Sequence, residues 1–316
     1  AFVPGGDAAA LLASLADAEE AALAACATKL NECRRELTTA AKRERAKGGA
    51  APVADGTGAR KPTVIIVGGG CAGATTARWF DLHFSDRFDL YLVDPKEYHE
   101  YTPHVTRARV STGDVQRRIR PRHSEYVRHG TVVVEPCQAV MADHIRVGSA
   151  GSDGTVLPFD YLIIASGTSY AENIKAVSPS LDYRLRQFAA ERKSLEAAER
   201  VVVIGGGILA METCGDVRDA FPNKELILVC RSTILRKSGP VPHPILKADW
   251  EARGVRVVDY EAMLPLEDGA THYVTDKGTK VCPVEGTRAI WCIGRGAPNA
   301  QFMPKTSLDA FGYIRV

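Results

Sequence analysis

The 316-residue sequence has little of several features that would place it in other protein classes. Its 40 Lys and Arg residues nearly balance 38 Asp and Glu, and a net charge of +2 gives nucleic-acid binding no compositional support. No apolar run approaches the roughly 18 residues that a membrane span needs. The eight cysteines include no Cys-x-x-Cys pair, so neither a zinc-ribbon site nor a thioredoxin-like dithiol is supported. We therefore expect a globular chain of about two domains, without a metal or a transmembrane segment.

Two glycine fingerprints are present, each at the end of a strand rich in β-branched residues. Their small residues are Gly68, Gly70 and Gly73 after residues 64–67, and Gly205, Gly207 and Ala210 after residues 201–204. The first position allows a tight turn, the second lets the backbone approach a pyrophosphate, and the third lets helix and strand pack closely. The helix N-terminus adds amide donors and a favourable dipole. Because a strand precedes and a helix-forming stretch follows each copy, two dinucleotide sites explain the pattern better than two ordinary glycine turns.

The end of the next strand distinguishes the two sites. After residues 89–93, Asp94 is placed to accept hydrogen bonds from a ribose 2′-hydroxyl, which suits FAD or NAD. After residues 226–229 no acid follows; Arg231 takes the adjacent place, with Arg236 one turn further on. Arginine pairs with a 2′-phosphate whereas a carboxylate repels it, so this site favours NADP. Two solvated surface arginines are the open alternative.

From residue 61 onward the pattern alternates strands and helices in the manner of an α/β protein. The strand candidates fall into two parallel sets, residues 64–67, 90–93 and 161–165, and residues 201–204, 226–229 and 289–293. Residues 131–147 with 155–159 resemble an inserted antiparallel meander, broken by the glycine-rich residues 148–154. We expect two Rossmann-like three-layer units, each with its ligand at the carboxyl ends of its strands.

The first sixty residues differ from the rest of the chain. Residues 8–46 contain no Gly or Pro and predict one long helix, and residues 48–58 indicate a flexible linker. The helix has a narrow apolar stripe too short for a self-sufficient coiled coil, so we expect an arm that docks on another protein. The opening Ala-Phe-Val-Pro resembles the cleavage context of proteins targeted to complex plastids, and a mitochondrial extension fits almost as well. We expect an organellar protein, peripheral or soluble, with the plastid favoured.

Two further motifs complete a resemblance around the first fingerprint. Thr102 and Pro103 belong to a segment similar to an aromatic-Thr-Pro segment that lies near a flavin ring. Ser166 and Gly167 end a strand and look like an Ala-Thr-Gly motif with Ser in place of Thr. In order and content, these motifs resemble the two-dinucleotide-binding flavoprotein oxidoreductases of the pyridine nucleotide-disulfide oxidoreductase superfamily. Within it, the sequence is most similar to type II NADH dehydrogenases and the apoptosis-inducing-factor-like ferroptosis suppressor proteins.

The nicotinamide half of the resemblance covers residues 205–216, which include Glu212 but have Ala210 in place of the third glycine. Residues 275–279 are similar to its hairpin, and the strand that leads to Gly294 is similar to its exit strand. By this resemblance Glu212 faces the nicotinamide, whereas an acid favoured by the helix dipole fits the same position equally well. Dithiol members are poorer matches because their cysteine pair is absent.

The resemblance implies a domain order. A helical extension and linker, residues 1–60, precede an FAD-binding domain at 61–195, an inserted NAD(P)-binding domain at 196–297 and a return to the FAD domain at 298–316. NADPH or NADH would deliver a hydride to FAD, and electrons would pass on to an acceptor such as a quinone. Since the flavin carries this chemistry, no catalytic side chain is assigned. In the family a Gly-Asp strand and an interface domain come next, and we expect the flavin domain to lack them here.

A function of another class is also open. The fold could be a degenerate flavoprotein retained as an accessory subunit of a large organellar complex, docked through residues 8–46. The incomplete flavin domain and the helical arm favour this alternative, whereas two intact phosphate cradles favour the oxidoreductase.

Overall fold

The computed structural model describes residues 60–112, 114–118, 120–170, 174–176, 178–239, 241–294 and 296–315. Contacts divide the chain after Arg60 and gather Lys61–Val316 in one compact unit. The helix and linker predicted at residues 8–46 and 48–58 lie outside the described residues.

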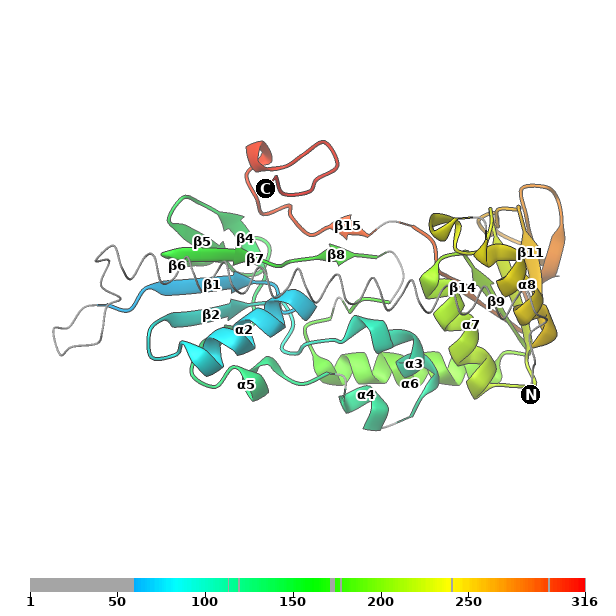
Figure 1. Ribbon diagram of the computed structural model, residues 1–316, viewed down its shortest axis with the longest axis horizontal. Helices are drawn as coiled ribbons and strands as arrows, with labels where there is room; N and C mark the ends of the chain where they lie inside the picture. Colours follow the sequence, from blue (N-terminus) through cyan, green and yellow to red (C-terminus); the bar gives the residue numbers. More distant parts are fainter. Residues whose placement is uncertain are drawn as a thin grey trace. The chain divides into compact units, whose positions relative to one another are not determined.

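The first sheet of this unit is parallel and has the strand order β3-β2-β1-β7 (Figure 1). Its strands are β1 (Thr63–Val67), β2 (Asp89–Val93), β3 (Thr131–Val133) and β7 (Tyr161–Ile164). All five residues of β1 are buried, because its side chains meet packed layers on both faces of the sheet. Complete burial of a Val or Ile side chain contributes about 1.5–3 kcal/mol, which makes β1 the centre of this core.

Different layers cover the two faces of this sheet. Helices α2 (Cys71–His83) and α5 (His123–Tyr126) pack on one face. The antiparallel strands β4 (Cys137–Val140), β5 (His144–Val147) and β6 (Thr155–Pro158) pack on the other. The result is a three-layer unit, as the sequence predicts.

One part of the predicted meander is wrong. Residues 131–133 do not join the antiparallel strands; they form β3, which pairs in parallel with β2 at Tyr91↔Thr131 and Val93↔Val133. The physical reason is that α5 precedes β3 and returns the chain to the same end of the sheet, so β3 extends the parallel sheet. The antiparallel part begins only at Cys137.

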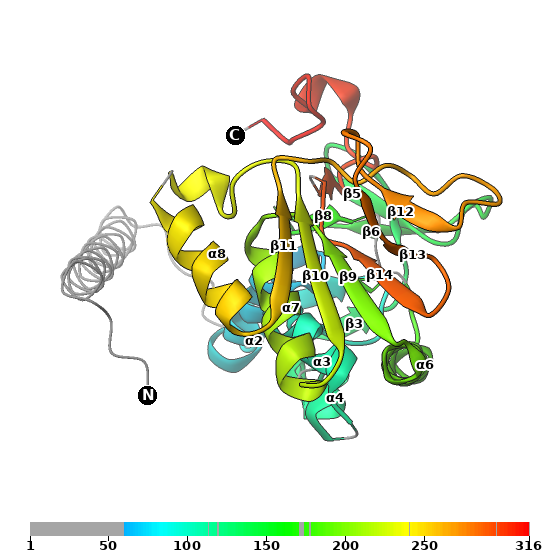
Figure 2. The same cartoon turned by 90° about the vertical axis from the view of Figure 1, so that its right-hand side faces the viewer.

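The second sheet is also parallel and has the order β11-β10-β9-β14, which Figure 2 shows side by side. Its strands are β9 (Arg200–Ile204), β10 (Glu225–Cys230), β11 (Val255–Asp259) and β14 (Thr287–Trp291). The two α/β units with parallel sheets predicted from the sequence are thus confirmed.

The layers of the second sheet repeat those of the first. Helices α7 (Ile208–Ala220) and α8 (Pro242–Ala252) contribute to the core on one face. The hairpin of β12 (His272–Val274) and β13 (Lys280–Pro283) packs on the other.

Short elements connect the two sheets. Strands β8 (Thr168–Ser169) and β15 (Ala297–Pro298) form an antiparallel ribbon, so the chain leaves the first half and returns to it along the same path. The remaining small helices of the described chain are η1 (Thr102–His104), α3 (Val105–Val110) and α4 (Asp114–Arg118) in the first half, η2 (Arg236–Ser238) between β10 and α8, and η3 (Lys305–Ser307) after β15.

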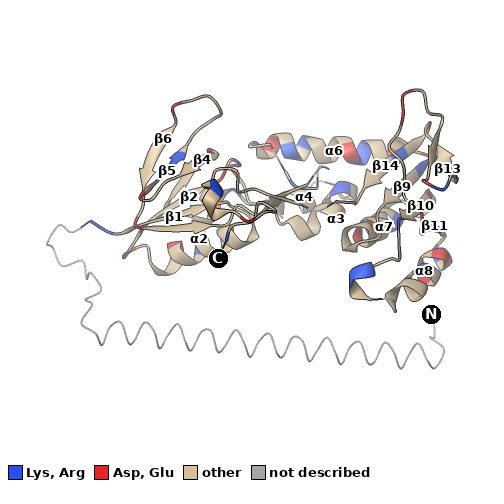
Figure 3. Cartoon of the chain, turned by 90° about the horizontal axis from the view of Figure 1, so that it is seen from above, with Lys and Arg blue, Asp and Glu red and all other residues tan. Residues whose placement is uncertain are grey.

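The long connecting helix α6 (Leu181–Ala197) begins where the Ser180 hydroxyl accepts a hydrogen bond from the Tyr183 N–H. Acidic and basic residues are interspersed along it (Figure 3). The domain boundary predicted between residues 195 and 196 falls in its last turn. Among the described helices, none combines the length and the apolar character needed to cross a bilayer.

Candidate dinucleotide sites

The first fingerprint forms a turn that only glycine fits. Gly68 has φ +106°, and a Cβ there would lie 2.4 Å from the Ala165 carbonyl oxygen. A Cβ on Gly73 would lie 1.7 Å from the Gly68 oxygen, so the absence of a side chain lets α2 pack against β1. Gly70, the N-cap of α2, has nothing within 4 Å of an added Cβ. The helix N-terminus therefore opens into free space, as a phosphate cradle requires.

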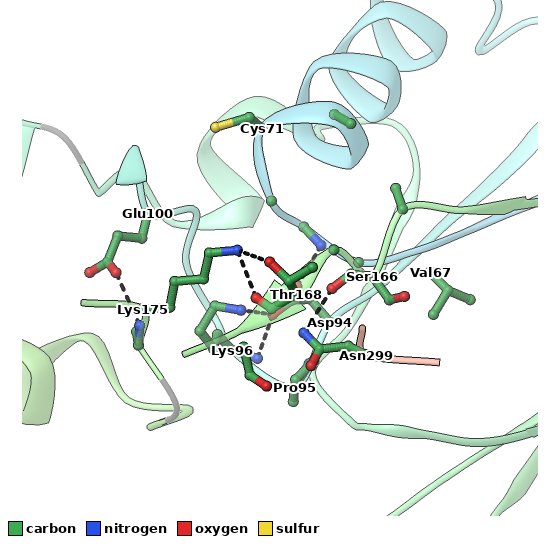
Figure 4. A pocket seen from close by; sticks show the side chains of 18 of the residues that line it. Val67, Cys71, Asp94, Pro95, Lys96, Glu100, Ser166, Thr168, Lys175 and Asn299 are labelled. Carbon is green, nitrogen blue, oxygen red and sulfur yellow. Dashed lines mark hydrogen bonds and ion pairs between the residues drawn. The ribbon is translucent and has the colours of Figure 1, made fainter. Parts of the chain in front are cut away.

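A cavity of about 730 Å³ adjoins this turn (Figure 4). This volume lies within the range of roughly 300–1,000 Å³ typical of ligand and cofactor pockets. Seven predicted site residues line it: Gly68, Gly70, Asp94, Thr102, Pro103, Ser166 and Gly167. Gly73 acts from behind the turn by allowing the helix to approach. The structure thus brings together residues that lie up to about one hundred positions apart in the sequence.

Asp94 is almost wholly buried at the end of β2. Its Oδ2 accepts a hydrogen bond from the Gly69 N–H, and its Oδ1 accepts from Lys96 N at 2.7 Å and Lys96 Nζ at 2.9 Å. Burial raises the pKa of this carboxyl, but interactions with His123, Lys96 and the Gly69 N–H outweigh burial and lower the pKa to about 2. Asp94 is therefore ionised at neutral pH, as an acceptor for ribose hydroxyls must be.

His123 is fully buried and packs against the glycine turn of the first fingerprint at Gly69. A Cβ on Gly69 would lie 2.3 Å from its Cε1, so the imidazole occupies the space beside that glycine. Its Nδ1 lies 2.5 Å from the Tyr126 hydroxyl oxygen, and its Nε2 lies 3.9 Å from Asp94 Oδ1. No sequence motif pointed to His123, because α5 brings it here from outside the fingerprint.

Glu100 lines the far side of the cavity and belongs to a buried ion-pair network. Its Oε2 accepts hydrogen bonds from Arg120 Nε at 2.9 Å and Arg184 Nε at 2.8 Å. Its Oε1 accepts a hydrogen bond from Ala176 N at 3.1 Å. Both guanidinium groups stack on the Phe188 ring, 4.1 and 4.2 Å from its centroid. Removing one partner from such a network leaves a buried charge uncompensated, so the network fixes this wall of the cavity.

The Ser166-Gly167 segment is held by the returning chain. Gly167 has φ +65°, and an added Cβ there would meet nothing within 4 Å. Asn299 Nδ2 donates to the Ser166 oxygen at 3.0 Å, and Asn299 N donates to the Gly167 oxygen at 2.9 Å. Asn299 also lines the cavity, although sequence reasoning did not identify it. Only the β8–β15 ribbon shows that residues 166 and 299 are neighbours.

The second fingerprint has the same turn with a different third residue. Gly205 has φ +139°, and a Cβ there would lie 2.4 Å from the Cys292 carbonyl oxygen. Gly207, the N-cap of α7, has nothing within 4 Å of an added Cβ. Ala210 is fully buried, so the fold accommodates a methyl group at the third position. Gly294 follows the neighbouring strand β14 with φ +107° and open space beside it.

Arg231 and Arg236 are exposed at the carboxyl end of the second sheet. Neither makes an ion pair or a side-chain hydrogen bond within the part of the chain that the structure describes. Their guanidinium groups are thus available to a ligand, as well as to solvent. Their role in binding a 2′-phosphate stays a prediction.

Glu212 lies in the second turn of α7 and is exposed overall. Partial burial of its carboxyl and the nearby charge of Asp216 raise its pKa, although His104 acts in the opposite direction. His104 belongs to η1, whose other two residues, Thr102 and Pro103, line the first cavity. Glu212 therefore lies on the side of the second unit that faces the first.

A histidine-aspartate pair that sequence reasoning missed supports the second site. His243 Nδ1 accepts a hydrogen bond from the Ile234 N–H at 3.0 Å, so Nε2 carries the proton and donates to Asp259 Oδ2 at 3.0 Å. Lys247 Nζ donates to the other oxygen of Asp259 at 2.9 Å. These bonds fix the loop between β10 and η2 against the end of β11.

Comparison with known proteins identifies the family to which this fold belongs. Residues 62–316 match the model of the pyridine nucleotide-disulphide oxidoreductase family. Apoptosis-inducing factor homolog B of Dictyostelium discoideum is 23% identical over 259 residues, 74% of this chain and 64% of the relative. Ferroptosis suppressor protein 1 of Taeniopygia guttata is 26% identical over 232 residues, 69% of this chain and 59% of the relative.

Solved structures share the fold. NDH2 of Plasmodium falciparum in complex with NADH superposes with a TM-score of 0.60 at 19% identity, over 78% of this chain and 58% of that one. An engineered water-forming NADPH oxidase bound to NADPH superposes with a TM-score of 0.61 at 20% identity, also over 78% and 58%. This chain thus spans about six tenths of the length of these relatives. With a family match over nearly all of the described residues, the chain belongs to the pyridine nucleotide-disulphide oxidoreductase family.

Proposed function

We propose that this chain forms the nucleotide-binding part of an FAD-dependent NAD(P)H oxidoreductase. The cavity between Gly70 and Thr102 carries the proposal, because it joins an open helix N-terminus, an ionised acid and the Thr-Pro segment in one site. Residues that lie apart in the sequence converge there as an FAD-binding site requires.

Each part of the cavity has a role in holding FAD. Asp94 would accept hydrogen bonds from the adenosine ribose, and the N-terminus of α2 at Gly70 would hold the pyrophosphate. Thr102, Pro103 and Gly167 flank the flavin end. FAD held there would supply the redox chemistry, hydride acceptance from a nicotinamide and electron transfer to an acceptor. The protein binds and orients the two cofactors.

The residues at the end of β10 favour NADPH over NADH. In the engineered NADPH oxidase, three consecutive substitutions replace aspartate by alanine, alanine by arginine and methionine by serine. This chain reads Cys230, Arg231 and Ser232 at the end of β10, without an acid and with the same Arg-Ser pair. A guanidinium beside the ribose forms charge-assisted hydrogen bonds with a 2′-phosphate, whereas a carboxylate would repel it.

A quinone is the acceptor we propose. The support is the resemblance to type II NADH dehydrogenases and the fold likeness to NDH2. The organellar location and the docking role of residues 8–46 stay predictions from the sequence.

The test is the colour of the purified full chain and its response to FAD. We expect a flavin absorbance band, or its appearance on reconstitution with FAD, and bleaching of that band by NADPH without oxygen. A colourless protein that takes up no FAD would contradict the oxidoreductase and support the accessory-subunit alternative. A flavoprotein that a quinone cannot reoxidise would contradict only the proposed acceptor.

A further inference from the structure

The charged residues that line the cavity are unevenly paired. Two carboxylates line it, Asp94 and Glu100. Asp94 pairs with Lys96, whereas Glu100 pairs with both Arg120 and Arg184. Lys175 is a further cation in the lining. In the lining, Lys96 and Lys175 equal Asp94 and Glu100 in number, but Glu100 is already neutralised by two arginines outside the lining, so the charge of Lys175 is left to attract an anionic ligand.

Lys175 is the cation in this set without a carboxylate partner. Its Nζ donates to the Thr168 carbonyl oxygen at 2.7 Å and to the Thr168 hydroxyl at 2.8 Å. It forms no ion pair with any residue that the structure describes. Figure 4 shows its side chain reaching from the Glu100 side of the cavity towards Thr168. Burial lowers the pKa of Lys175, which marks a partly desolvated charge.

Lys175 and the N-terminus of α2 border the same cavity. Cys71, the first residue of α2, lines the same cavity as Lys175. The ammonium group of Lys175 and the helix N-terminus thus act on the same region of the cavity. A helix N-terminus alone supplies roughly half an elementary charge, which is less than a pyrophosphate carries.

We propose that Lys175 is the counter-charge for the pyrophosphate of the bound dinucleotide, acting together with the N-terminus of α2. This inference rests on the proposed FAD site and adds a residue to it. The other cations already have partners. Lys96 is bound to Asp94, and the two arginines are paired with Glu100 and stacked on Phe188. Lys175 is held by two neutral oxygens of Thr168 and lies over the Tyr170 ring, 5.2 Å from its centroid, and its flexible stem lets the ammonium turn to an anion at low cost.

Substitution of the lysine in the full chain tests this. We expect Lys175→Met to raise the dissociation constant for FAD and for ADP about 10- to 100-fold, the usual effect of losing a charge-assisted hydrogen bond. Riboflavin, which has no phosphate, should bind the variant and the wild type equally. Because salt screens a charge pair, FAD binding by the variant should also depend less on NaCl concentration. Lys175→Arg should retain FAD affinity within about threefold.

The control is Lys305→Met, which removes an exposed lysine outside the cavity and should leave all three affinities unchanged. If Lys175→Met does not fold, as judged by thermal unfolding, Lys175→Gln is judged by the same criteria. Unchanged FAD and ADP affinities in a folded variant would overturn the inference and leave the FAD site intact. If the wild type binds ADP but not FAD, and the variant loses ADP, the counter-charge stands and the FAD proposal fails. A wild type that binds neither contradicts both.

Discussion

The turns at Gly68 and Gly205 have the same construction: each glycine has a positive φ, and a Cβ there would lie 2.4 Å from a carbonyl oxygen that follows a neighbouring strand. They differ at the third position, where the first has Gly73 and the second a buried Ala210. They differ again at the tip of the next strand, where Asp94 corresponds to a position beside Arg231. In the function we propose, the backbone of both glycine turns faces a pyrophosphate, and the side chains around each turn select the dinucleotide.

The third small residue of the fingerprint should give the largest difference between the two glycine turns. In Gly73→Ala the new methyl group would lie 1.7 Å from the Gly68 oxygen, so α2 must move and FAD binding should be lost. We expect this change to cost about 3 kcal/mol or more of unfolding free energy. Ala210→Gly, which relieves no clash, should cost about 1 kcal/mol and leave FAD binding intact. Denaturant unfolding and FAD titration measure both. Equal losses of unfolding free energy in the two variants would mean that the two glycine turns do not differ in how their helices pack.

Asp94→Asn should remove the pH dependence that Asp94 gives to the stability of the fold. In the folded protein the pKa of Asp94 is about 2, below the usual aspartate value of about 3.9. A lowered pKa stabilises the fold above about pH 4, and this stabilisation is lost as the pH falls through 2. The shift corresponds to roughly 2 kcal/mol at neutral pH. Unfolding free energies between pH 7 and pH 2 should therefore fall more for the wild type than for Asp94→Asn. Cys230→Ala changes the equivalent position at the end of β10. Its unfolding free energy should fall between pH 7 and pH 2 by as much as that of the wild type.

Charge reversal at Arg231 should change the selectivity for NADPH over NADH at the second fingerprint and leave the first site unaffected. In Arg231→Glu a carboxylate repels the 2′-phosphate and accepts hydrogen bonds from a 2′-hydroxyl. The ratio of NADPH to NADH affinity should fall roughly 10- to 100-fold, with FAD affinity unchanged. Nucleotide titrations with Lys277→Glu, an exposed charge reversal in the hairpin turn, provide the matched control. An unaltered ratio would remove the role assigned to Arg231.

Glu212 should give the smallest effect, with the opposite sign to Asp94. Its pKa is raised, so its ionised form is disfavoured in the fold and stability is lost as the pH rises above the usual glutamate range. Glu212→Gln should therefore melt at the same temperature as the wild type near pH 4 and roughly 1–2 °C higher at pH 8. Thermal unfolding at the two pH values checks this. A lower melting temperature at pH 8 would show that the carboxylate makes a stabilising contact.

Much of this fold could be predicted from short stretches of sequence. The runs that became β1 and β9 are β-branched and continuous, which is typical of strands buried on both faces, and the glycines after them fix the turn to a helix. The short run at residues 131–133 was assigned to the wrong sheet, because three β-branched residues do not show which strand they pair with. That choice depends on α5, a short helix with a weak local signal.

The cavity itself could be predicted only in part. The fingerprint, Asp94, and the segments at Thr102 and Gly167 each have a local signature. Lys175, Asn299 and His123 have none: Asn299 and His123 act through neighbours distant in the sequence, and Lys175 is identified only by the cavity that it lines.

The sequence by itself determined where the chain turns from strand to helix and which glycines make those turns, because sterics and hydrogen bonding act there between residues a few positions apart. The tertiary structure decided which charges meet. Glu100 faces two arginines, and Lys175 reaches the cavity without a carboxylate, only because α6 and the β8–β15 ribbon bring distant segments together. Electrostatic interactions act through space, so their balance is set by the folded arrangement.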